Sequence, residues 1–494
     1  MQGVAPTSHL FDPRPCRPND QNPILPRRRS QLAKLPERGM PADIAYQLIK
    51  DMRQLDSNPR LNLASFVTTW MEPEAEKLIQ ESLNVNFVDV EQYPSCATIE
   101  RRCVAMLATL FHAPVAEEGK AVGTSGIGSS EAILLAGLAM KKRWTKARKA
   151  AGKPFDRPNL IMGANVQVCW HKFTRYWDVE EKLVPVKEDV WVATPKDLVA
   201  ACDENTIGVV GILGSTYTGA FESIEGIDTA IEKLNKEKGW NIGIHVDGAS
   251  GAFVAPFLFP DLKWDFRLKN VVSINASGHK YGLVYPGIGW TVWRSPEFLP
   301  EEMVFHTNYL GSDQPSFTLN FSKGASMIVA QYYQFLRLGF DGYRRIMTNL
   351  QAVAKRMTLA LEATGHFKIL STDLSVPLVA FSINKRVDKD GKSHSRTYDE
   401  FDLADRLHAR GWILPAYNMC KDVQNVSLMR AVIREDMSMS MVDELVSDIK
   451  RATDYLDNHF VFSKAQVSAM AMRMHVGTEL PDEYYADKHH PAVC

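Results

Sequence analysis

A histidine and a lysine stand side by side in the stretch ASGHKYG, residues 276–282, directly after the apolar run VVSIN. A deprotonated lysine amine is a nucleophile that forms Schiff bases with carbonyl compounds, and desolvation lowers the pKa of such an amine. A second apolar run, IGIHV, is followed by Asp247 in the stretch HVDGASG. Because parallel strands present their carboxyl ends at one edge of a sheet, Lys280 and Asp247 are expected to converge on one crevice.

A glycine- and serine-rich stretch, GTSGIGSSEA at residues 123–132, leads directly into a helical pattern of apolar residues. The backbone N–H groups and the dipole at the start of a helix favour an anion, so Ser129 and Ser130 are candidates for holding a phosphate. No lysine stands where a Walker loop requires one, which argues against a mononucleotide P-loop.

A phosphate loop, a carboxylate and a lysine are together what pyridoxal phosphate needs. The lysine forms the Schiff base, and the acid keeps the pyridinium nitrogen protonated so that the ring can accept electrons. Each residue also has a purely structural interpretation: Ser129 as a helix cap, Asp247 as a turn former, His279 as a hydrogen-bonded core histidine and Lys280 as a surface lysine. The combination in this order favours the cofactor site.

Short apolar runs of strand length alternate with helical patterns between residues 120 and 295, which implies right-handed crossovers and a mainly parallel sheet covered on both faces. The strand candidates are NLIMGANV, GVVGILGST, IGIHVDGA, VVSINASG and GIGWTVWR. A long helix over residues 325–365 is predicted to bridge into a smaller domain with the strands PLVAFSIN and VSLMRAVI. We expect the polar stretch KRVDKDGKSHSR between them to be a solvated loop and residues 441–460 to form a last helix.

The first 40 residues are rich in proline and predict a flexible or partner-bound arm, followed by a helical pattern over residues 41–55. The resulting division has four parts. It consists of an N-terminal arm and helix over residues 1–60, a large cofactor-binding domain over 61–345, a small α+β C-terminal domain over 346–460 and a tail over 461–494.

The composition is that of an ordinary globular protein. Of the 494 residues, 45% are hydrophobic and 23% charged, and the formal net charge is -1 from 57 basic and 58 acidic residues. This balance gives no reason to expect a nucleic-acid partner. No apolar run of about 18 residues predicts a membrane helix, the proline-rich start is unlike a secretory signal, and the seven cysteines form no CxxC pair. We therefore expect a cytoplasmic protein without membrane association.

Over roughly residues 40–460 the chain resembles the pyridoxal-phosphate-dependent group II decarboxylases, and within them the glutamate decarboxylases of the bacterial and plant type. The stretches that carry the resemblance are NLASFVTTW, NVNFVDVEQYP, GTSGIGSSEA, VQVCWHKFTRYWDVE, HVDGASGAFVAPF, WDFRL, ASGHKYG, FSKGAS and LMRAVIRED. The resemblance implies an α/β fold of the aspartate aminotransferase-like type (type I) and pyridoxal 5'-phosphate as cofactor.

The resemblance also implies roles for single residues. Lys280 would form the Schiff base and Asp247 would pair with the pyridine nitrogen. Gln167 occupies the place where aromatic-amino-acid decarboxylases carry a histidine stacked on the ring, which favours glutamate as the substrate. Thr216 would lie near the ring hydroxyl and the substrate, and Ser322 is expected to reach the phosphate from a second subunit. The other phosphate ligands implied are Ser129, Ser130, Ser277 and His279.

The reaction implied is conversion of L-glutamate to 4-aminobutyrate and CO2 through the Schiff base and a quinonoid intermediate. Arg430 would grip the α-carboxylate, a task suited to a bidentate guanidinium. The residues implied around the distal carboxylate are Ser65, Phe66, Asn86 and Asp89. A plain surface role stays open for Asn86 and Asp89. Because Asp89 beside a substrate carboxylate is costly unless a proton or a bridge intervenes, we expect an acidic activity optimum.

Tyr309, in HTNYLGSDQPS, is a candidate for protonating Cα, as is the region of Lys280, and the loop could close the site against water. An ordinary surface loop is the alternative. Two other functions also stay open. One is a different amino-acid decarboxylase or carbon–carbon lyase, and the other is a catalytically silent scaffold, which the presence of Lys280 and Asp247 disfavours.

The resemblance implies a homodimer with active sites at the subunit interface, which in some members assembles into hexamers through N-terminal segments. Plant relatives often end in a calmodulin-binding helix. The tail here, residues 460–494, has no tryptophan and few basic residues before Glu479, so it is a poor basic amphipathic helix. Calmodulin therefore stays a disfavoured alternative.

Overall fold

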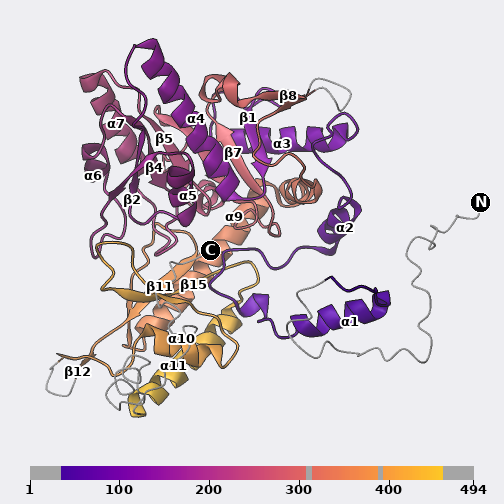
Figure 1. The fold of residues 1–494 in the computed structure, drawn as a ribbon. Coiled ribbons are helices and arrows are strands. Elements are labelled where there is room, and N and C mark those ends of the chain that lie inside the picture. Colours follow the sequence, from indigo (N-terminus) through magenta and orange to yellow (C-terminus); the bar gives the residue numbers. More distant parts are fainter. Residues whose placement is uncertain (1–34, 308–313, 388–392, 460–494) are drawn as a thin grey trace, which may run out of the picture. The chain divides into compact units, whose positions relative to one another are not determined.

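The computed structural model describes residues 35–307, 314–387 and 393–459 (Figure 1). The chain divides into two units, Met1–Asn58 and Pro59–Cys494. The described part of the first unit holds helix α1, Ala42–Arg53, which begins directly after Pro41 and buries none of its residues. The helix predicted over residues 41–55 is thus confirmed.

The second unit is built around a seven-stranded sheet with the order β1-β7-β6-β5-β4-β2-β3. The strands β6, β5, β4, β2 and β3 run parallel, and β7 is antiparallel to both β6 and β1. The bounds are β1 Val122–Gly126, β2 Asn159–Gly163, β3 Glu180–Val184, β4 Thr206–Ile212, β5 Gly243–Asp247, β6 Val271–Ala276 and β7 Gly289–Trp293. The mainly parallel sheet is confirmed, and all five predicted strand stretches of this region overlap one of its strands.

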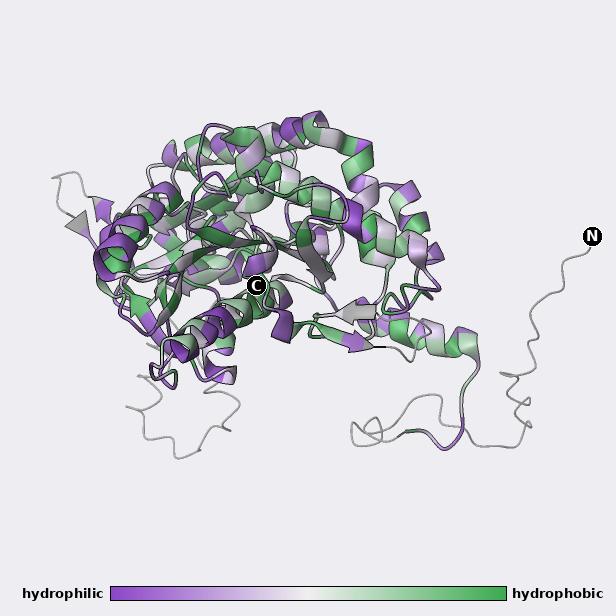
Figure 2. Ribbon diagram, turned by 90° about the horizontal axis from the view of Figure 1, so that it is seen from above, coloured by the Kyte–Doolittle hydropathy of each residue, from purple (hydrophilic) through white to green (hydrophobic). Residues whose placement is uncertain are grey.

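Helices cover both faces of this sheet because its strands are apolar on both sides. Leu160 and Met162 of β2 pack with helices α4, Ser129–Ala150, and α5, Val168–Tyr176, on one face. Ile161, between them, belongs to the core on the other face. The helices that contribute to that second core include α3 Pro94–Leu110, α6 Pro195–Ala200, α7 Ile224–Lys238, α8 Ala255–Leu258 and α9 Ser326–Glu362. Figure 2 shows the apolar strands between helices whose outer sides are polar.

Helix α9 runs from the large sheet to a smaller antiparallel sheet, as predicted for residues 325–365. One residue inside it, Gly339, is not helical, with φ 55° and ψ -174°, so the helix is broken there. A positive φ of this kind is open to glycine at little cost. The second half of α9 packs on β10, Phe367–Ile369, and β11, Leu378–Ile383.

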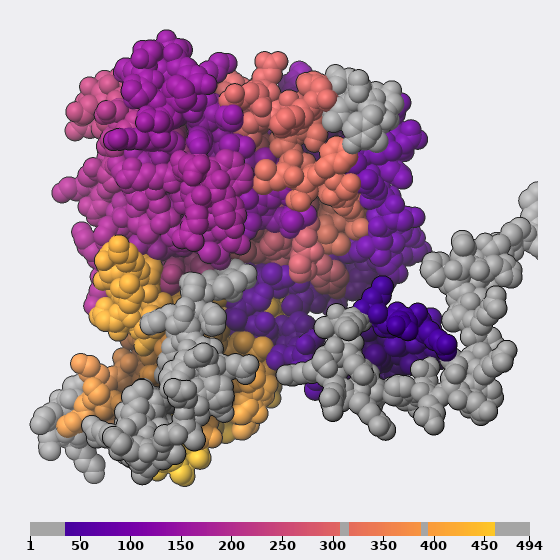
Figure 3. Space-filling view, in the orientation of Figure 1, coloured from indigo at the N-terminus to yellow at the C-terminus, as the bar shows by residue number. Residues whose placement is uncertain are grey.

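The smaller sheet is antiparallel and has the strand order β10-β11-β15-β14. It includes β14, Ala416–Asn418, and β15, Ser427–Val432, and helices α10, Glu400–His408, and α11, Met439–Asn458, complete it. This agrees with the α+β domain and the last helix expected from the sequence. Figure 3 shows the orange and yellow residues of this part directly against the magenta residues of the large sheet's helices.

Among the described residues, α2, Pro73–Glu81, two short strand pairs and four short 3-10 helices complete the fold. These short helices are Pro59–Leu61, Gly251–Phe253, Pro296–Phe298 and Glu301–Met303. The expectation of a solvated loop over residues 385–396 is wrong at its two ends. Arg386–Val387 (β12) and Ser393–His394 (β13) pair as antiparallel strands, because an antiparallel ladder uses backbone groups and tolerates polar side chains. The other pair is β8, Phe305–Thr307, with β9, Gln314–Ser316.

The domain boundaries predicted at residues 60, 345 and 460 stay predictions, and α9 runs across the second of them. The tail at 461–494 and the first 34 residues lie outside the described residues. Within the described parts of the chain, no helix is long and apolar enough to cross a membrane.

Candidate active site

The start of α4 lies against the turn that follows β6, residues 277–282. The Oγ atoms of Ser129 and Ser277 are 2.5 Å apart, and Asn275 Nδ2 donates to Ser129 Oγ at 3.1 Å. A Cβ atom at Gly289 of β7 would lie 2.4 Å from the carbonyl carbon of Gly128, so only glycine lets the two backbones approach this closely. The first N–H groups of a 22-residue helix, which have no partner within the helix, are thereby presented beside Ser277.

Asp247 is the last residue of β5 and is held by three N–H donors. Its Oδ2 accepts a hydrogen bond from Trp170 Nε1 at 2.9 Å, and its Oδ1 accepts from Asn275 Nδ2 and from the Ala249 N–H, both at 3.2 Å. The side chain is nearly buried, and these donors leave it one orientation. A fixed carboxylate at the end of a parallel strand suits an acid that must face a ring nitrogen.

Lys280 lies in the turn after β6, with 9% of the residue exposed. Its Nζ donates to Ser250 Oγ at 3.3 Å and lies 5.0 Å from the centre of the Phe66 ring. Its backbone carbonyl accepts a hydrogen bond from Thr68 Oγ1 at 3.0 Å. The amine is therefore inside the protein, next to one hydroxyl and one aromatic face.

His279 is a neutral imidazole, and one of its ring nitrogens has no partner in the part of the chain that the structure describes. Burial, followed by the charge of Lys280, lowers its pKa to about 4. Its Nδ1 is buried and has no hydrogen-bond partner among the described residues. Since buried polar atoms are normally paired, this atom indicates a missing ligand group. The sequence-based alternative of a fully hydrogen-bonded core histidine does not fit it.

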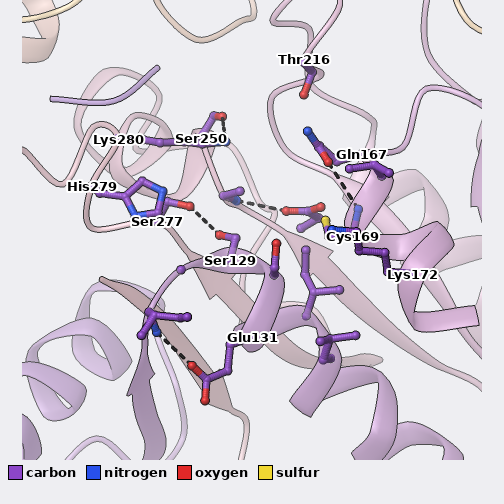
Figure 4. A pocket seen from close by; sticks show the side chains of 18 of the residues that line it. Ser129, Glu131, Gln167, Cys169, Lys172, Thr216, Ser250, Ser277, His279 and Lys280 are labelled. Carbon is purple, nitrogen blue, oxygen red and sulfur yellow. Dashed lines mark hydrogen bonds between the residues drawn. The ribbon is translucent and has the colours of Figure 1, made fainter. Parts of the chain in front are cut away.

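These residues line one cavity of about 560 Å³, which is large enough for a cofactor of the size of pyridoxal phosphate. In Figure 4, Lys280, His279 and Ser277 lie on one side and Gln167, Cys169 and Thr216 on the other, with Ser129 between them. The predicted residues that line the cavity are Ser129, Ser130, Gln167, Thr216, Asp247, Ser277, His279 and Lys280. The residues therefore fit the cofactor: a helix start for its phosphate, an acid, and an amine.

Gln167 caps α5, since its side-chain oxygen accepts a hydrogen bond from the Cys169 N–H at 3.3 Å. The Cys169 thiol lies in the same cavity. Burial, followed by the negative charge of Asp247, raises the pKa of this thiol far above its usual range, so it is uncharged. The polar groups of Gln167 and Cys169 are thus neutral.

Arg430 lies behind the cavity wall rather than in it. Its guanidinium donates to the carbonyl oxygens of Thr216 and Ala64 and lies 4.8 Å from the centre of the Phe66 ring. Its Nε is buried without a hydrogen-bond partner in the described chain. Ser65 is next to Phe66 in the chain and uses its hydroxyl to accept the Val67 N–H at 3.1 Å.

Six of the predicted residues do not line this cavity in one chain, namely Ser65, Phe66, Arg430, Asn86, Asp89 and Ser322. Asn86 forms a bridge with Gly324, and Asp89 Oδ1 accepts a hydrogen bond from the Gln92 N–H at 3.4 Å. Ser322 lines a second cavity of about 320 Å³. Tyr309 lies outside the described residues.

Sequence reasoning missed several residues of the site. Glu131 of α4 is buried and accepts the N–H groups of Ile127 at 2.9 Å and Leu319 at 3.1 Å, which ties two loops at the cavity together. A glutamate in the first turn of a helix predicts only a favourable interaction with the helix dipole, so the sequence held no stronger signal. The other cavity residues missed include Asn165, Cys169, Lys172, Ser250 and Asn320.

Comparisons with known proteins agree with this geometry. The model of the pyridoxal-dependent decarboxylase conserved domain matches residues 36–384. The chain is 55% identical to a glutamate decarboxylase of Solanum lycopersicum over 424 residues, which are 86% of this chain and 83% of the relative. It is 44% identical to a glutamate decarboxylase of Lactococcus lactis subsp. cremoris over 432 residues, 87% of this chain and 91% of the relative.

Solved structures share the fold. The glutamate decarboxylase of Lactobacillus brevis has a TM-score of 0.81 at 41% sequence identity and covers 89% of this chain and 99% of its own. A sphingosine-1-phosphate lyase of Burkholderia pseudomallei has a TM-score of 0.71 at 21% identity, over 92% of this chain and 97% of its own, and shows the same fold. These likenesses confirm the expected type I fold. Since the family model matches well over half of the chain, the protein belongs to the pyridoxal-dependent decarboxylases.

Proposed function

We propose that this protein is a glutamate decarboxylase that converts L-glutamate to 4-aminobutyrate and CO2 with pyridoxal 5'-phosphate as cofactor. The observation that carries the proposal is the single cavity that joins Lys280, Asp247 and the start of α4. The relatives that support the substrate are named glutamate decarboxylases and cover most of the chain. When bound, the cofactor supplies an electron-accepting ring for the electrons of the breaking Cα–carboxylate bond.

The residues of the cavity hold and orient this group. Lys280 Nζ is the amine that would bind the cofactor's carbonyl carbon, and Asp247 would accept a hydrogen bond from its protonated ring nitrogen. The first N–H groups of α4 would hold the phosphate together with Ser129, Ser277 and His279. A neutral His279 would donate one hydrogen bond to the phosphate and would add no positive charge beside Lys280.

Two groups are proposed to handle the proton that Cα receives. The amine of Lys280 would be one carrier of this proton, and Ser250 Oγ lies 3.3 Å from this amine. Tyr309 is the other candidate and stays a prediction, because it lies outside the described residues.

Arg430 is proposed to bind a substrate carboxylate through its unpaired Nε. The carbonyls of Thr216 and Ala64 fix the rest of the guanidinium, and Phe66 packs against its face. Because a buried guanidinium N–H without a partner is costly, a carboxylate oxygen is a favourable ligand for it.

Asn86, Asp89 and Ser322 are proposed to complete the site of a second subunit in a homodimer. Two exposed apolar residues beside the cavity support this, since Ile127 is 58% and Leu319 is 44% exposed while both line the cavity. Assembly into a hexamer, a cytoplasmic location and the lack of calmodulin binding stay predictions.

The test is the visible absorption spectrum of the purified protein with pyridoxal phosphate, followed by CO2 release from glutamate, aspartate and tyrosine. We expect a visible band that Lys280→Ala abolishes and that Lys238→Ala, a change of an exposed lysine at the end of α7, preserves. CO2 from glutamate alone supports the proposal. A cofactor band with CO2 only from another amino acid would replace the substrate, and the absence of a band would favour a scaffold.

A further inference from the structure

The segment of residues 59–71, here called the connector, runs between the small α+β part and the turn after β6 that holds Lys280. Its first half is held by Arg434, whose residue is 1% exposed. Arg434 also lies 3.6 Å from Asp436 as an ion pair. The guanidinium donates to four backbone carbonyls of the connector, those of Pro59 at 3.1 Å, Arg60 at 3.2 Å, Asn62 at 2.8 Å and Ser65 at 3.2 Å.

Two successive threonines in the connector bind opposite neighbours. The Thr69 N–H donates to Glu435 Oε1 at 3.1 Å, and its hydroxyl donates to Asp436 Oδ2 at 2.6 Å. Thr68, which is 2% exposed, donates its N–H to the carbonyl of His279 at 2.9 Å and its hydroxyl to the carbonyl of Lys280 at 3.0 Å. Through these two residues the connector binds both parts at once.

We propose that Thr68 is a positioning residue for Lys280, and that the triplet Arg434–Glu435–Asp436 sets the place of Thr68 through the connector. The proposal rests on the cofactor chemistry proposed above for Lys280. Two hydrogen bonds to consecutive carbonyls fix the peptide planes on both sides of the Lys280 Cα, and with them the direction of its side chain. Phe66, on the same connector, also lies against the Lys280 amine.

The hydroxyl of Thr68 can be tested with a pair of substitutions. Thr68→Val keeps the shape and removes the hydroxyl donor, so that the Lys280 carbonyl keeps only the hydrogen bond from the Leu283 N–H at 3.0 Å. Thr68→Ser restores the hydroxyl donor. We expect Thr68→Val to lower kcat for glutamate about tenfold with KM changed less than about twofold, and to weaken the visible circular dichroism of the bound cofactor. Thr68→Ser is expected to restore both.

Thr453 offers a matched control. It is fully buried in α11 and its hydroxyl also donates to a backbone carbonyl, that of Ile449 at 2.7 Å. Thr453→Val is expected to lower thermal stability as much as Thr68→Val while leaving kcat and the circular dichroism unchanged. The proposal fails if the two valine variants behave alike, or if a folded Thr68→Ser protein stays as impaired as Thr68→Val.

The coupling to the small part is tested with Asp436→Asn, which weakens the contacts to Arg434 and Thr69. If the triplet acts through Thr68, the double variant with Thr68→Val should lose little more in kcat than Thr68→Val alone. Multiplied losses would overturn this part. Should the wild-type protein bind the cofactor but act on another amino acid, the circular dichroism would still decide the role of Thr68, whereas the proposed substrate would fail separately.

Discussion

Asp247 is the residue whose chemistry depends most on charge. Its carboxylate is fixed by three N–H donors. In an asparagine at this position, the NH2 group would face a donor where the carboxylate presents an acceptor. We expect Asp247→Asn to lower kcat at least about a hundredfold, because a neutral group cannot stabilise a protonated ring nitrogen. CO2 release measures this, and the visible band should show that cofactor is still bound. Asp261→Asn, an exposed change, serves as the control, and near-normal turnover in Asp247→Asn would contradict the assigned role.

Glu222 is a buried carboxyl group next to Asn165, which lines the cavity. It accepts hydrogen bonds from the Ile212 N–H at 2.8 Å, the Ala193 N–H at 3.3 Å and Asn165 Nδ2 at 3.4 Å. Burial nevertheless raises its pKa from 4.5 to about 7. The folded protein thus binds more protons than the unfolded one between these values, and Glu222 costs stability as the pH rises through that window.

Glu222→Gln removes this titration. Relative to the wild-type protein, we expect the free energy of unfolding of Glu222→Gln to rise by about 2 kcal/mol between pH 5 and pH 8. Urea unfolding at a series of pH values measures it. His279 and His245 act in the opposite direction, since burial lowers the pKa of each to about 4 and their contribution is lost as the pH falls from 6.5. A difference between the two proteins that does not vary with pH would exclude a raised pKa for Glu222.

The residues found from the sequence are those whose type alone indicates a chemical role, namely a lysine, a carboxylate and a histidine at strand ends. Thr68 was not found, because a threonine gives no sign of which carbonyl it will bind in a folded chain. Likewise, nothing in NVNFVDV indicates that Asn86 pairs with Gly324 instead of reaching Lys280 in the same chain.

The elements that carry the site are held together by one close approach, that of β7 to the start of α4. A Cβ atom at Gly289 would lie 2.4 Å from a backbone carbon of Gly128. We therefore expect Gly289→Ala to displace the phosphate loop, to lower cofactor affinity at least about tenfold and to cost about 1–3 kcal/mol of stability. Equilibrium dialysis with pyridoxal phosphate and thermal unfolding measure the two effects.

Gly39→Ala is the matched control for this substitution, since a Cβ atom there meets nothing within 4 Å. Equal cofactor affinity in the two alanine variants would show that α4 does not need the close approach.

At the scale of elements, periodicity predicted β2, β4, β5, β6, β7, α9 and α11, whose apolar residues recur regularly, but it missed the parallel strand β3. It missed β1, because VGTSG has few apolar residues and becomes a strand only by pairing with β7. It also missed the break at Gly339, since a single glycine within a long apolar pattern indicates no direction of its φ angle. Local sequence patterns do not show which distant strands will pair through their backbones.

At the scale of the whole molecule, the proposed homodimer places exposed apolar residues beside the cavity in an interface. A charge at Ile127 would have to be buried there, so Ile127→Asp is expected to yield monomers with at most about a tenth of the wild-type kcat. Sedimentation velocity and CO2 release measure this. Leu359→Asp, at another exposed apolar residue, 53% exposed in α9, should leave both unchanged. A dimeric and active Ile127→Asp protein would place the interface elsewhere.

The order of the large sheet has a consequence for how the protein is made. β1 is the first of the seven strands along the chain, yet it lies at the sheet's edge beside β7, the last, with Val122 opposite Trp293. On the ribosome, the nascent chain can form its parallel strands while β1 still waits for a partner. The loop after β1 meets Gly289 only once that strand has been translated. Capture of the cofactor is therefore expected to follow synthesis of the large sheet rather than accompany it.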